Sequence, residues 1–336
     1  MFTKDPVSLA VTEQSQIGET RRVGVAMAEA LGFDETSRGE IAIVLTELAS
    51  NLVRHANGGE VLLRSLPPTE CCGLEVLALD RGPGIIDVAA ALRDGFSTRS
   101  SPGNGLGAVG RLSTTTDLYS VNGHGSAMMA HFRLPQAPPV ADNVGWVCLP
   151  MPGETACGDA CDVVDLGGGR TVAIVVDGLG HGLHAAEASR RAMQVFRENA
   201  TLDSPQLFDL MHNALRTTRG AAISVADIRR GQHEVCYTGV GNVSGRLVEH
   251  GKVRGMVSHN GTVGAKIHRV QQFSYPWTPD TLLVMQSDGL ASQWRPEQYP
   301  GLFNRHASLI AGVLYRDHRR TRDDVTVLAL SGRGAA

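Results

Sequence analysis

The chain has 336 residues, a formal net charge of −3, 39 glycines and six cysteines. This length exceeds the usual size of a single domain, so we expect two domains. The small net charge gives no electrostatic reason for binding nucleic acid or an anionic membrane. No apolar stretch approaches the ~20 residues that a helix needs to cross a bilayer, which predicts a soluble, cytoplasmic protein.

Helical periodicity dominates the start of the chain. Apolar spacing predicts amphipathic helices over Ile17 to Leu31 and over Thr36 to Ala56. On the second helix Glu47 and Asn51 are four residues apart, so their side chains lie on one face beside the apolar stripe. A solvated helix edge is the more common explanation for such a pair when it stands alone. The neighbouring motifs are therefore needed to interpret it.

The helices are followed by strand patterns and glycine turns. A strand over Leu74 to Leu79 runs into Asp80-Arg-Gly-Pro-Gly84, so that an aspartate ends the strand and opens a turn. The segment Pro102 to Gly107 leads into a helix from about Leu106 to Leu112, and the free N–H groups of such a helix start attract phosphate. A hairpin is expected around Asn122-Gly-His-Gly125. The first domain is therefore predicted to consist of helices followed by a mostly antiparallel sheet.

One literal motif match is not favoured. Gly105-Leu-Gly-Ala-Val-Gly110 has the GxGxxG spacing of dinucleotide-binding folds. The residues before it are Ser-Pro-Gly-Asn, where that motif requires a strand. We therefore do not expect a Rossmann site.

In order along the chain, these motifs resemble the boxes of the GHKL ATPases, and look most like the RsbT- and RsbW-type serine kinases of bacterial partner-switching systems. The matching pieces are Glu47-x-x-x-Asn51, Asp80-x-Gly82-x-Gly84, the Phe-Ser-Thr step at 96–98, Gly105-x-Gly107 and Gly125-Ser126. The resemblance covers about residues 10 to 134. It implies a Bergerat-type α/β sandwich that binds ATP with Mg²⁺. The family usually has Gly-Thr where this chain has Gly-Ser, which keeps the hydroxyl.

The resemblance also assigns roles to individual residues. Asn51 would ligate the Mg²⁺ of ATP, Asp80 would accept a hydrogen bond from the adenine amino group, and Glu47 would be the catalytic base toward a substrate serine. These roles suit phosphoryl transfer, which needs an aligned nucleophile and a neutralised triphosphate. The remaining nucleotide-binding positions implied are Gly82, Gly84, Gly103, Gly105, Gly107 and Ser126.

A proline-rich segment predicts the domain boundary. Leu134-Pro-Gln-Ala-Pro-Pro-Val140 contains three prolines, which cannot continue a sheet and favour extended backbone. We place a short linker at 135–142, between a first domain at 1–134 and a second at 143–336.

Aspartates at strand ends mark the second domain. The apolar run Thr171 to Val176 ends in Asp177, followed by glycines at 178, 180 and 182 and a predicted helix over Leu183 to Asn199. A second helix is expected over Pro205 to Thr218, and many strands flanking one helical layer predict an α+β sandwich. Three other aspartates lie at predicted strand ends: Asp159, Asp288 and Asp323. Alone, each could form a turn. If they meet at one edge, hard cations are needed to hold them together.

The set Gly158-Asp159, Asp177-Gly-x-Gly-His-Gly182, Ser287-Asp-Gly289 and Asp323-Asp-x-Thr326 resembles the SpoIIE and RsbX branch of the metal-dependent PP2C serine phosphatases. This resemblance spans about residues 143 to 331. It implies that a pair of Mg²⁺ or Mn²⁺ ions is bound by Asp159, Asp177, Asp288 and Asp323. Asp177 would be the central ligand of this site and a catalytic residue. The Gly178 carbonyl would be a further ligand. We expect Asp324 to organise the turn rather than to bind metal.

Several other residues carry weaker signals. Cys157 and Cys161 could suggest zinc, but no second pair follows at a suitable spacing. His181 could be a general acid or could make a structural hydrogen bond. The arginines between Arg316 and Arg322 are interpreted as a solvated helix end. We identify no arginine placed to grip the substrate phosphate.

Together the motifs predict a bifunctional switch protein. Its first domain would phosphorylate a serine or threonine of a partner, and its second would remove such a phosphate. By resemblance the partner would be a STAS-domain antagonist or a stressosome-like protein. The alternatives are an active phosphatase whose ATP domain is only a regulatory module, and a binding protein that sequesters its partner. The sequence leaves the oligomeric state and the choice of Mg²⁺ or Mn²⁺ open.

Overall fold

The computed structural model describes residues 6–66, 72–91, 105–135 and 143–333. The chain forms two compact units, which are considered separately. The first contains Met1–Val140 and Pro300–Arg316, and the second contains Ala141–Tyr299 and Asp317–Ala336. Residues 136–142, which make up most of the predicted linker, lie outside the described ranges. Within those ranges no helix is both long and apolar enough to cross a membrane.

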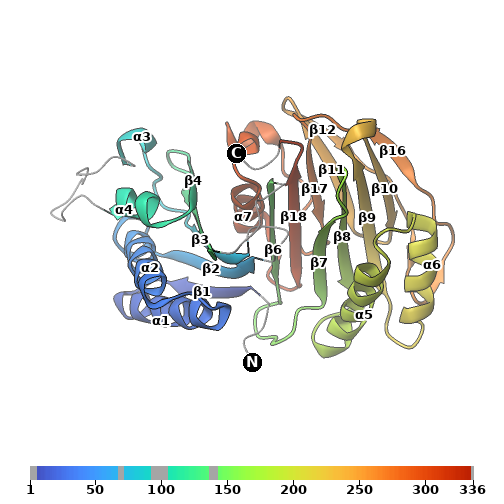
Figure 1. The fold of residues 1–336 in the computed structure, drawn as a ribbon, viewed down its shortest axis with the longest axis horizontal. Helices are drawn as coiled ribbons and strands as arrows, with labels where there is room; N and C mark the ends of the chain where they lie inside the picture. The colour runs from blue at the N-terminus through green and yellow to red at the C-terminus, as the bar shows by residue number, and fades with distance from the viewer. Residues whose placement is uncertain (1–5, 67–71, 92–104, 136–142, 334–336) are drawn as a thin grey trace. The chain divides into compact units, whose positions relative to one another are not determined.

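The first unit is built on a five-stranded sheet with the order β1-β2-β3-β5-β4, in which all neighbours are antiparallel. Helices α1 and α2 cover one face of this sheet (Figure 1). The strands are β1 (Val7–Val11), β2 (Gly59–Leu66), β3 (Gly73–Leu79), β4 (Thr115–Ser120) and β5 (Ser126–Arg133). The helices are α1 (Gln14–Leu31), α2 (Glu35–His55), α3 (Val88–Ala91), α4 (Gly105–Leu112), α7 (Ala307–His318) and the 3₁₀ turn η3 (Leu302–Asn304).

Local capping defines the two long helices. Glu13 and Gln16 form a capping box at the start of α1, and Gly32, with φ of 91°, caps the helix after Leu31. Asp34 caps α2 by accepting a hydrogen bond from the Ser37 amide at 2.8 Å. The predicted helices are confirmed with ends shifted by up to three residues, whereas β1 was not expected.

The predicted apolar stripe of α2 faces the core of the first unit. All five of its members are buried: Ile41, Val44, Leu45, Leu48 and Leu52. Helix α1 approaches this stripe closely, because a Cβ on Gly24 would lie 2.2 Å from Leu45 Cδ1. The stripe therefore packs against both its helical neighbour and the sheet, which leaves the polar edge of α2 for other roles.

The other face of the sheet is also buried. Every residue of β3 is buried, and a Cβ on Gly312 of α7 would lie 2.4 Å from Leu77 Cδ2 and 3.2 Å from Leu79 Cδ2. Arg316 is only 7% exposed, so the expectation of a solvated helix end is wrong for this residue. Residues 300–316 belong to the first compact unit, whereas the second domain expected from the sequence covers 143–336. The domain boundaries stay a prediction.

The second unit contains two larger sheets and a two-stranded ribbon. The first sheet has the order β13-β10-β9-β8-β7, with β16 also paired to β10, and the second has the order β12-β11-β17-β18-β6. The strands are β6 (Asn143–Leu149), β7 (Asp159–Asp165), β8 (Arg170–Gly178), β9 (Ala221–Arg229), β10 (Glu234–Val240), β11 (Ser244–Glu249), β12 (Lys252–Gly255), β13 (Ser258–His259), β14 (Gly261–Thr262), β15 (Lys266–Ile267), β16 (Phe273–Pro276), β17 (Leu282–Gln286) and β18 (Val325–Ser331).

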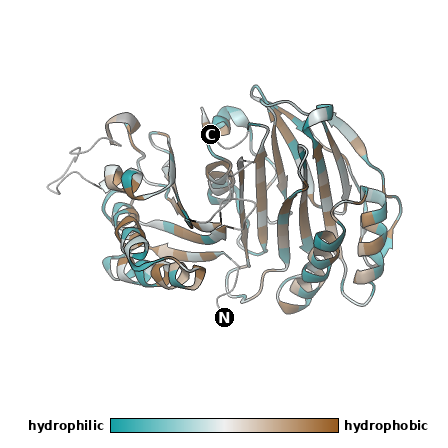
Figure 2. Cartoon of the chain, in the orientation of Figure 1, coloured by the Kyte–Doolittle hydropathy of each residue, from teal (hydrophilic) through white to brown (hydrophobic). Residues whose placement is uncertain are grey.

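The second unit is layered. Its helices are α5 (Leu183–Asn199), α6 (Ser204–Leu215) and the 3₁₀ turns η1 (Arg230–Gln232) and η2 (Pro296–Gln298). One core joins the two sheets, and another joins α5 and α6 to β8 and β9. The central strands β8, β9, β17 and β18 are almost entirely buried. Figure 2 shows much of these strands in brown, the apolar end of its scale. The predicted α+β architecture is confirmed, and it brings strand ends from different sheets to one edge.

Candidate nucleotide and metal sites

Helix α2 and the start of α4 bring the first candidate residues together. Glu47 and Asn51 are both half-buried on α2. The Glu47 Oε2 atom lies 2.9 Å from the point that a Cβ on Gly105 would occupy. A glycine at 105 therefore leaves room for the carboxylate beside the first residue of α4. Gly103 and the Phe-Ser-Thr step at 96–98 lie outside the described residues.

Asp80 is held at the end of β3 by backbone groups. Its Oδ1 accepts hydrogen bonds from the Gly82 amide at 2.7 Å and from the Ser126 amide at 3.2 Å. Its own amide donates to the Ser126 carbonyl at 2.9 Å. Burial raises the pKa of the Asp80 carboxyl. The ends of β3 and β5 thus fix both the backbone and the carboxylate of Asp80.

The glycines around Asp80 are needed for close packing. Gly84 has φ of 76°, and a Cβ there would lie 2.3 Å from the Val121 carbonyl oxygen. Gly125 has φ of 82°, and its Cβ would lie 2.1 Å from the Asp80 carbonyl oxygen. A Cβ on Gly82 would meet the Ala56 Cα at 2.6 Å. Any larger residue would displace the turn that carries the carboxylate.

This arrangement fits an adenine nucleotide in its donor and acceptor chemistry. Both amides bind Oδ1 of the half-buried Asp80 carboxylate. The second carboxylate oxygen, Oδ2, is the atom that would accept from an amino group. The Ser126 hydroxyl lies 3.0 Å from the Ser120 hydroxyl, which also accepts from the Ile85 amide at 2.7 Å. Ser120 is a supporting residue that the motif comparison did not single out.

The strand-end aspartates of the second unit lie near one another. Asp159 and Asp177 are directly opposed in the antiparallel pair β7 and β8. Asp288 follows β17, and Asp323 precedes β18 in the facing sheet. One sheet therefore supplies two of the carboxylates and the other supplies the remaining two.

The electrostatics of this cluster reflect the proximity of like charges. Burial, followed by the Asp288 and Asp323 carboxylates, raises the pKa of Asp177 to about 7. Burial and then the Asp177 carboxylate raise the pKa of Asp159 well above its usual range. Burial and Asp288 also raise the pKa of Asp323. Removing like charges from water and placing them together disfavours ionisation, and a divalent cation reverses this effect.

Supporting hydrogen bonds orient some of these carboxylates. The Ser287 hydroxyl donates to Asp159 Oδ2 at 2.6 Å. The Asn242 side-chain amide donates to Asp288, an interaction that was not anticipated from the sequence. The Gly241-Asn242 turn directly after β10 is the signal that could have pointed to it. The Asp177 Oδ2 atom is buried and has no partner in the described part of the chain, so it is available to a cation.

Asp324 has a different environment. Its two oxygens accept hydrogen bonds from the Met151 amide at 2.7 Å and from the Gly158 amide at 2.8 Å. Both oxygens are thus engaged in holding the loop before β7. This is the geometry expected of a turn-organising residue.

The donor set fits Mg²⁺ or Mn²⁺, which prefer carboxylate oxygens. In the described ranges no group of three or more His, Cys, Asp or Glu side chains is already close enough to hold a metal ion. The four-aspartate ligand set and the Gly178 carbonyl therefore stay predictions. The zinc alternative gains no support either. The Cys157 Sγ instead lies 3.8 Å from the Sγ of Cys148.

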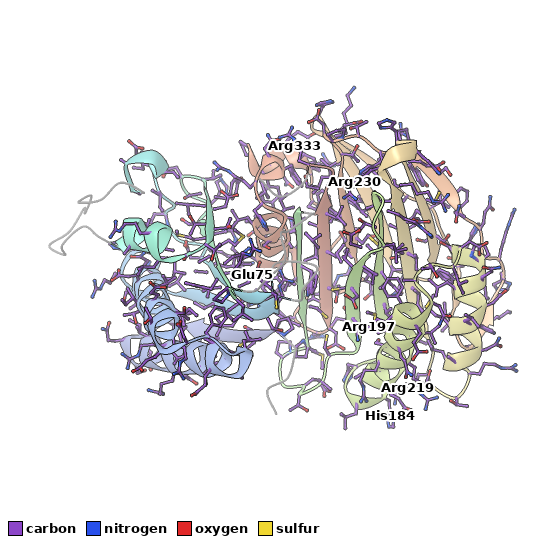
Figure 3. All side chains as sticks on the ribbon, in the orientation of Figure 1. Glu75, His184, Arg197, Arg219, Arg230 and Arg333 are labelled. Atoms are coloured by element: carbon purple, nitrogen blue, oxygen red, sulfur yellow. The ribbon has the colours of Figure 1, made fainter. Side chains whose placement is uncertain are left out.

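The glycine turn after Asp177 carries two further polar groups. His181 Nδ1 lies 2.7 Å from Glu154 Oε1, so its structural hydrogen bond is present. A guanidinium nitrogen of Arg219 lies 2.9 Å from the point that a Cβ on Gly180 would occupy. Figure 3 shows Arg219 and His184 at the same end of the second unit, where α5 begins. Arg219 is thus an exposed arginine beside the turn, which the sequence alone did not reveal.

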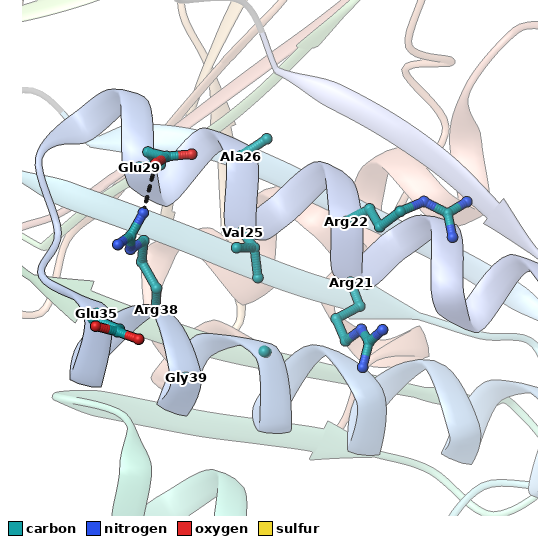
Figure 4. Close-up of a pocket in the computed structure, with 9 residues that line it drawn as sticks. Arg21, Arg22, Val25, Ala26, Glu29, Glu35, Arg38 and Gly39 are labelled. Atoms are coloured by element: carbon teal, nitrogen blue, oxygen red, sulfur yellow. Dashed lines mark hydrogen bonds and ion pairs between the residues drawn. The ribbon is translucent and has the colours of Figure 1, made fainter.

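A surface depression of the first unit is unrelated to either cluster. It lies between α1 and α2, and contains a Glu29–Arg38 ion pair of 2.7 Å (Figure 4). None of the candidate residues lines it: the lining is Arg21, Arg22, Val25, Ala26, Glu29, Glu35, Arg38, Gly39 and Ala42. We therefore assign it no part in the chemistry.

Comparison with known proteins assigns the two parts of the chain to two families. Residues 10–129 match the histidine kinase-like ATPase domain family, and residues 167–333 match the stage II sporulation protein E (SpoIIE) family. The serine/threonine-protein kinase RsbT of Bacillus subtilis (strain 168) is 32% identical over 126 residues, which are 38% of this chain and 95% of that protein.

Solved structures resemble parts of the chain. One described as "The bacterial stressosome: a modular system that has been adapted to control secondary messenger signaling" is 26% identical, with a TM-score of 0.53, and covers 56% of this chain and 97% of its own. RsbX in complex with magnesium is 20% identical, with a TM-score of 0.49, and covers 55% and 92% respectively.

These family matches define a regulator that joins a kinase-like ATPase domain to a PP2C-type phosphatase domain. The chain belongs to the RsbT family of histidine kinase-like ATPases, and it carries a SpoIIE-type phosphatase domain in the same polypeptide. It is thus a regulator of the partner-switching kind.

Proposed function

We propose that the chain both adds phosphate to a STAS-domain partner and removes it. The partner would be an anti-sigma antagonist or a stressosome-like protein, modified on serine or threonine. The observation that carries the proposal is the presence, in one polypeptide, of the Glu47, Asn51 and Asp80 set and of the strand-end aspartates. The 32% identity to a serine/threonine kinase, over 95% of that protein, supports the first half of the proposal.

In the N-terminal unit each residue has a separate task. Bound Mg-ATP supplies the phosphoryl group and the charge neutralisation that its transfer requires. Asp80 accepts from the adenine amino group, and Asn51 holds the Mg²⁺. Glu47, beside the first residue of α4, accepts the proton of the attacking hydroxyl. Its position one helical turn before Asn51 brings base and metal ligand to the same face of α2.

In the C-terminal unit the carboxylates form the metal-binding edge. Two Mg²⁺ or Mn²⁺ ions supply Lewis acidity and charge neutralisation for phosphate hydrolysis when bound. Asp159, Asp177, Asp288 and Asp323 hold them, with the Gly178 carbonyl. Asn242 orients Asp288 and Ser287 orients Asp159. Arg219, exposed beside the glycine turn, offers its guanidinium to the partner's phosphate.

The test is a time course of partner phosphorylation. The full chain is mixed with Mg-ATP and a panel of purified STAS-domain proteins, and phosphoserine and phosphothreonine on these proteins are followed. Phosphate should accumulate faster with Asp177→Asn and should not appear with Asn51→Ala. Asp209→Asn, an exposed aspartate of α6, is the matched control and should behave as wild type.

Each contrary outcome has a distinct meaning. Phosphatase activity and ATP binding without transfer to any STAS protein would reduce the N-terminal unit to a regulatory nucleotide module. Unchanged dephosphorylation by Asp177→Asn would remove the phosphatase assignment. If both activities are absent, the chain is a binding protein that sequesters its partner.

A further inference from the structure

The sheet of the first unit is covered on its second face by residues from the phosphatase part of the sequence. An antiparallel sheet with helices on one side usually leaves its other side in water. Here Leu77, Leu79 and Met129 of that other side are at most 1% exposed. Residues 300–316 supply the cover, and Gly312 lets the α7 backbone approach Leu77 and Leu79 directly.

Polar contacts fix this cover at both ends. At its start, Asp117 accepts hydrogen bonds from the His306 amide at 2.8 Å and from Arg305 Nη1 at 3.2 Å. Toward its end, the Tyr315 hydroxyl donates to Glu60 Oε1 at 2.9 Å. Such paired polar contacts around an apolar centre specify one docked position.

A buried charged cluster lies beneath the same segment. Glu75 is 2% exposed and bonds to Arg64 Nε at 3.0 Å and to His131 Nε2 at 2.7 Å. The His131 ring stacks edge-on against His306, with centroids 5.0 Å apart. Undocking the segment would expose this cluster to water, so docking and the stability of the sheet face are linked.

The last residue of the segment reaches the candidate adenine site. Arg316 Nη1 donates to the Asp80 carbonyl at 2.8 Å and to the Ser126 carbonyl at 3.3 Å. The amide of Ser126 and the carboxylate of Asp80 are themselves bonded. Arg81 donates in return to the Arg316 carbonyl. Arg316 therefore clamps the two strand ends that hold the adenine-accepting carboxylate.

The chain beyond Arg316 leads into the candidate metal site. Within the second unit, the His318 carbonyl accepts from the Ala291 amide at 2.9 Å, and the Arg320 amide donates to the Gly289 carbonyl at 2.8 Å. These bonds attach residues 318–320 to the turn that follows Asp288, and Asp323 comes shortly afterwards. One short stretch of chain thus connects the Asp80 clamp to two of the predicted metal ligands.

We propose that Arg316 is a positioning residue for Asp80 and that residues 300–316 couple nucleotide binding to the turns carrying Asp288 and Asp323. This inference rests on the proposed binding of ATP at Asp80. A nucleotide that binds Asp80 in its clamped position favours the docked segment, which in turn orders residues 317–323. The coupling is positive, and bound metal strengthens nucleotide binding by the same factor.

The test measures nucleotide affinity and backbone protection on the full chain. Binding of a fluorescent ADP analogue at fixed Mg²⁺ should weaken ~10-fold in Arg316→Ala, since charge-assisted bonds are lost, and less in Arg316→Lys, which keeps the charge without the planar fork. Arg333→Ala removes an exposed arginine paired with Asp280. It is the matched control and should stay within about twofold of wild type, as expected for a surface ion pair.

The second readout is hydrogen exchange with and without ADP. In the wild type, saturating ADP should slow exchange of the amides at 287–291 and 317–323. In Arg316→Ala, saturated with ADP, that protection should be absent. Because the wild-type arm needs no variant, it decides the coupling even if Arg316→Ala fails to fold by circular dichroism, and the ADP affinity of Arg316→Lys then decides the positioning role.

Failure of this inference and failure of the proposed function give different results. Tight ADP binding with no protection at 287–291 and 317–323 would overturn the coupling and leave the ATP site in place. Equal ADP affinity in a folded Arg316→Ala would overturn the positioning role. If the wild type binds no ADP, the proposed ATP site and this inference fall together.

Discussion

The raised pKa of Asp177 makes metal binding pH-dependent in a measurable way. A cation binds the ionised carboxylate, so the Asp177 carboxyl must lose its proton before its oxygens can act as ligands. With a pKa of about 7, Asp177 is about 76% ionised at pH 7.5 and about 3% ionised at pH 5.5. The apparent affinity of the nucleotide-free chain for Mn²⁺ should therefore fall ~25-fold between these pH values.

Calorimetric titration of the full chain with Mn²⁺ measures this effect. Titrations in two buffers of different ionisation enthalpy also report the number of protons released. Near pH 6 about one proton per binding event should come from Asp177. The number can exceed one because the pKa values of Asp159 and Asp323 are raised as well. Asp177→Asn should bind weakly and lose about one proton from this count.

The matched control is Asp280→Asn, an exposed aspartate whose pKa is lowered by its hydrogen bond with Arg333. It should retain the wild-type pH dependence. A carboxylate of ordinary pKa is almost fully ionised across this range and would change the affinity by less than about twofold. A wild-type change that small would refute the reasoning.

Three stability predictions follow from buried charges. Without metal, the folded state holds a proton on Asp177 that the unfolded chain releases, so the free energy of unfolding falls as the pH rises from about 4 to 7. At pH 7.5, Asp177→Asn should therefore be more stable than the wild type by about 1–4 kcal/mol in calorimetry. Equal melting temperatures would contradict this. Glu75→Gln leaves the buried Arg64 charge uncompensated and should lower the free energy of unfolding in denaturant by about 3 kcal/mol. The control Glu29→Gln, at an exposed ion pair, should lower it by less than about 1 kcal/mol. Similar losses in the two variants would contradict the argument from burial. Burial lowers the pKa of His306 to about 3, so this ring stays neutral in the folded state while the unfolded chain takes up a proton below pH 6.5. Acidification from pH 6.5 to 5 should therefore destabilise the wild type by about 2 kcal/mol more than His306→Asn. If the unfolding free energies of the two proteins depend on pH in parallel, this explanation is excluded.

Local pattern was sufficient for much of the fold. The stripe of α2 and the run Thr171 to Val176 could be read from the chain because helix and strand periodicity depend on neighbouring residues. The same is true of aspartates placed at strand ends beside glycines. These features predicted both sandwiches and both residue sets, although the metal ligands and catalytic roles stay predictions.

Tertiary structure decided what no local pattern encodes. The pairing of Asp159 with Asp177, the bond from Asn242 to Asp288 and the position of Arg219 all depend on strand register and on which turns meet. Residues far apart in sequence meet only when whole sheets close, so spacing along the chain does not contain these contacts.

The segment 300–316 shows this division most clearly. From the sequence we interpret only a solvated helix end from Arg316 onwards and predict no buried helix over Ala307 to Tyr315, although these residues are largely apolar. The sequence does not say which surface covers it, because any apolar sheet face satisfies the same requirement. Only the folded chain places Gly312 on Leu77 and Arg316 on Asp80. Both the burial of this helix and the surface that it covers were therefore decided by tertiary packing.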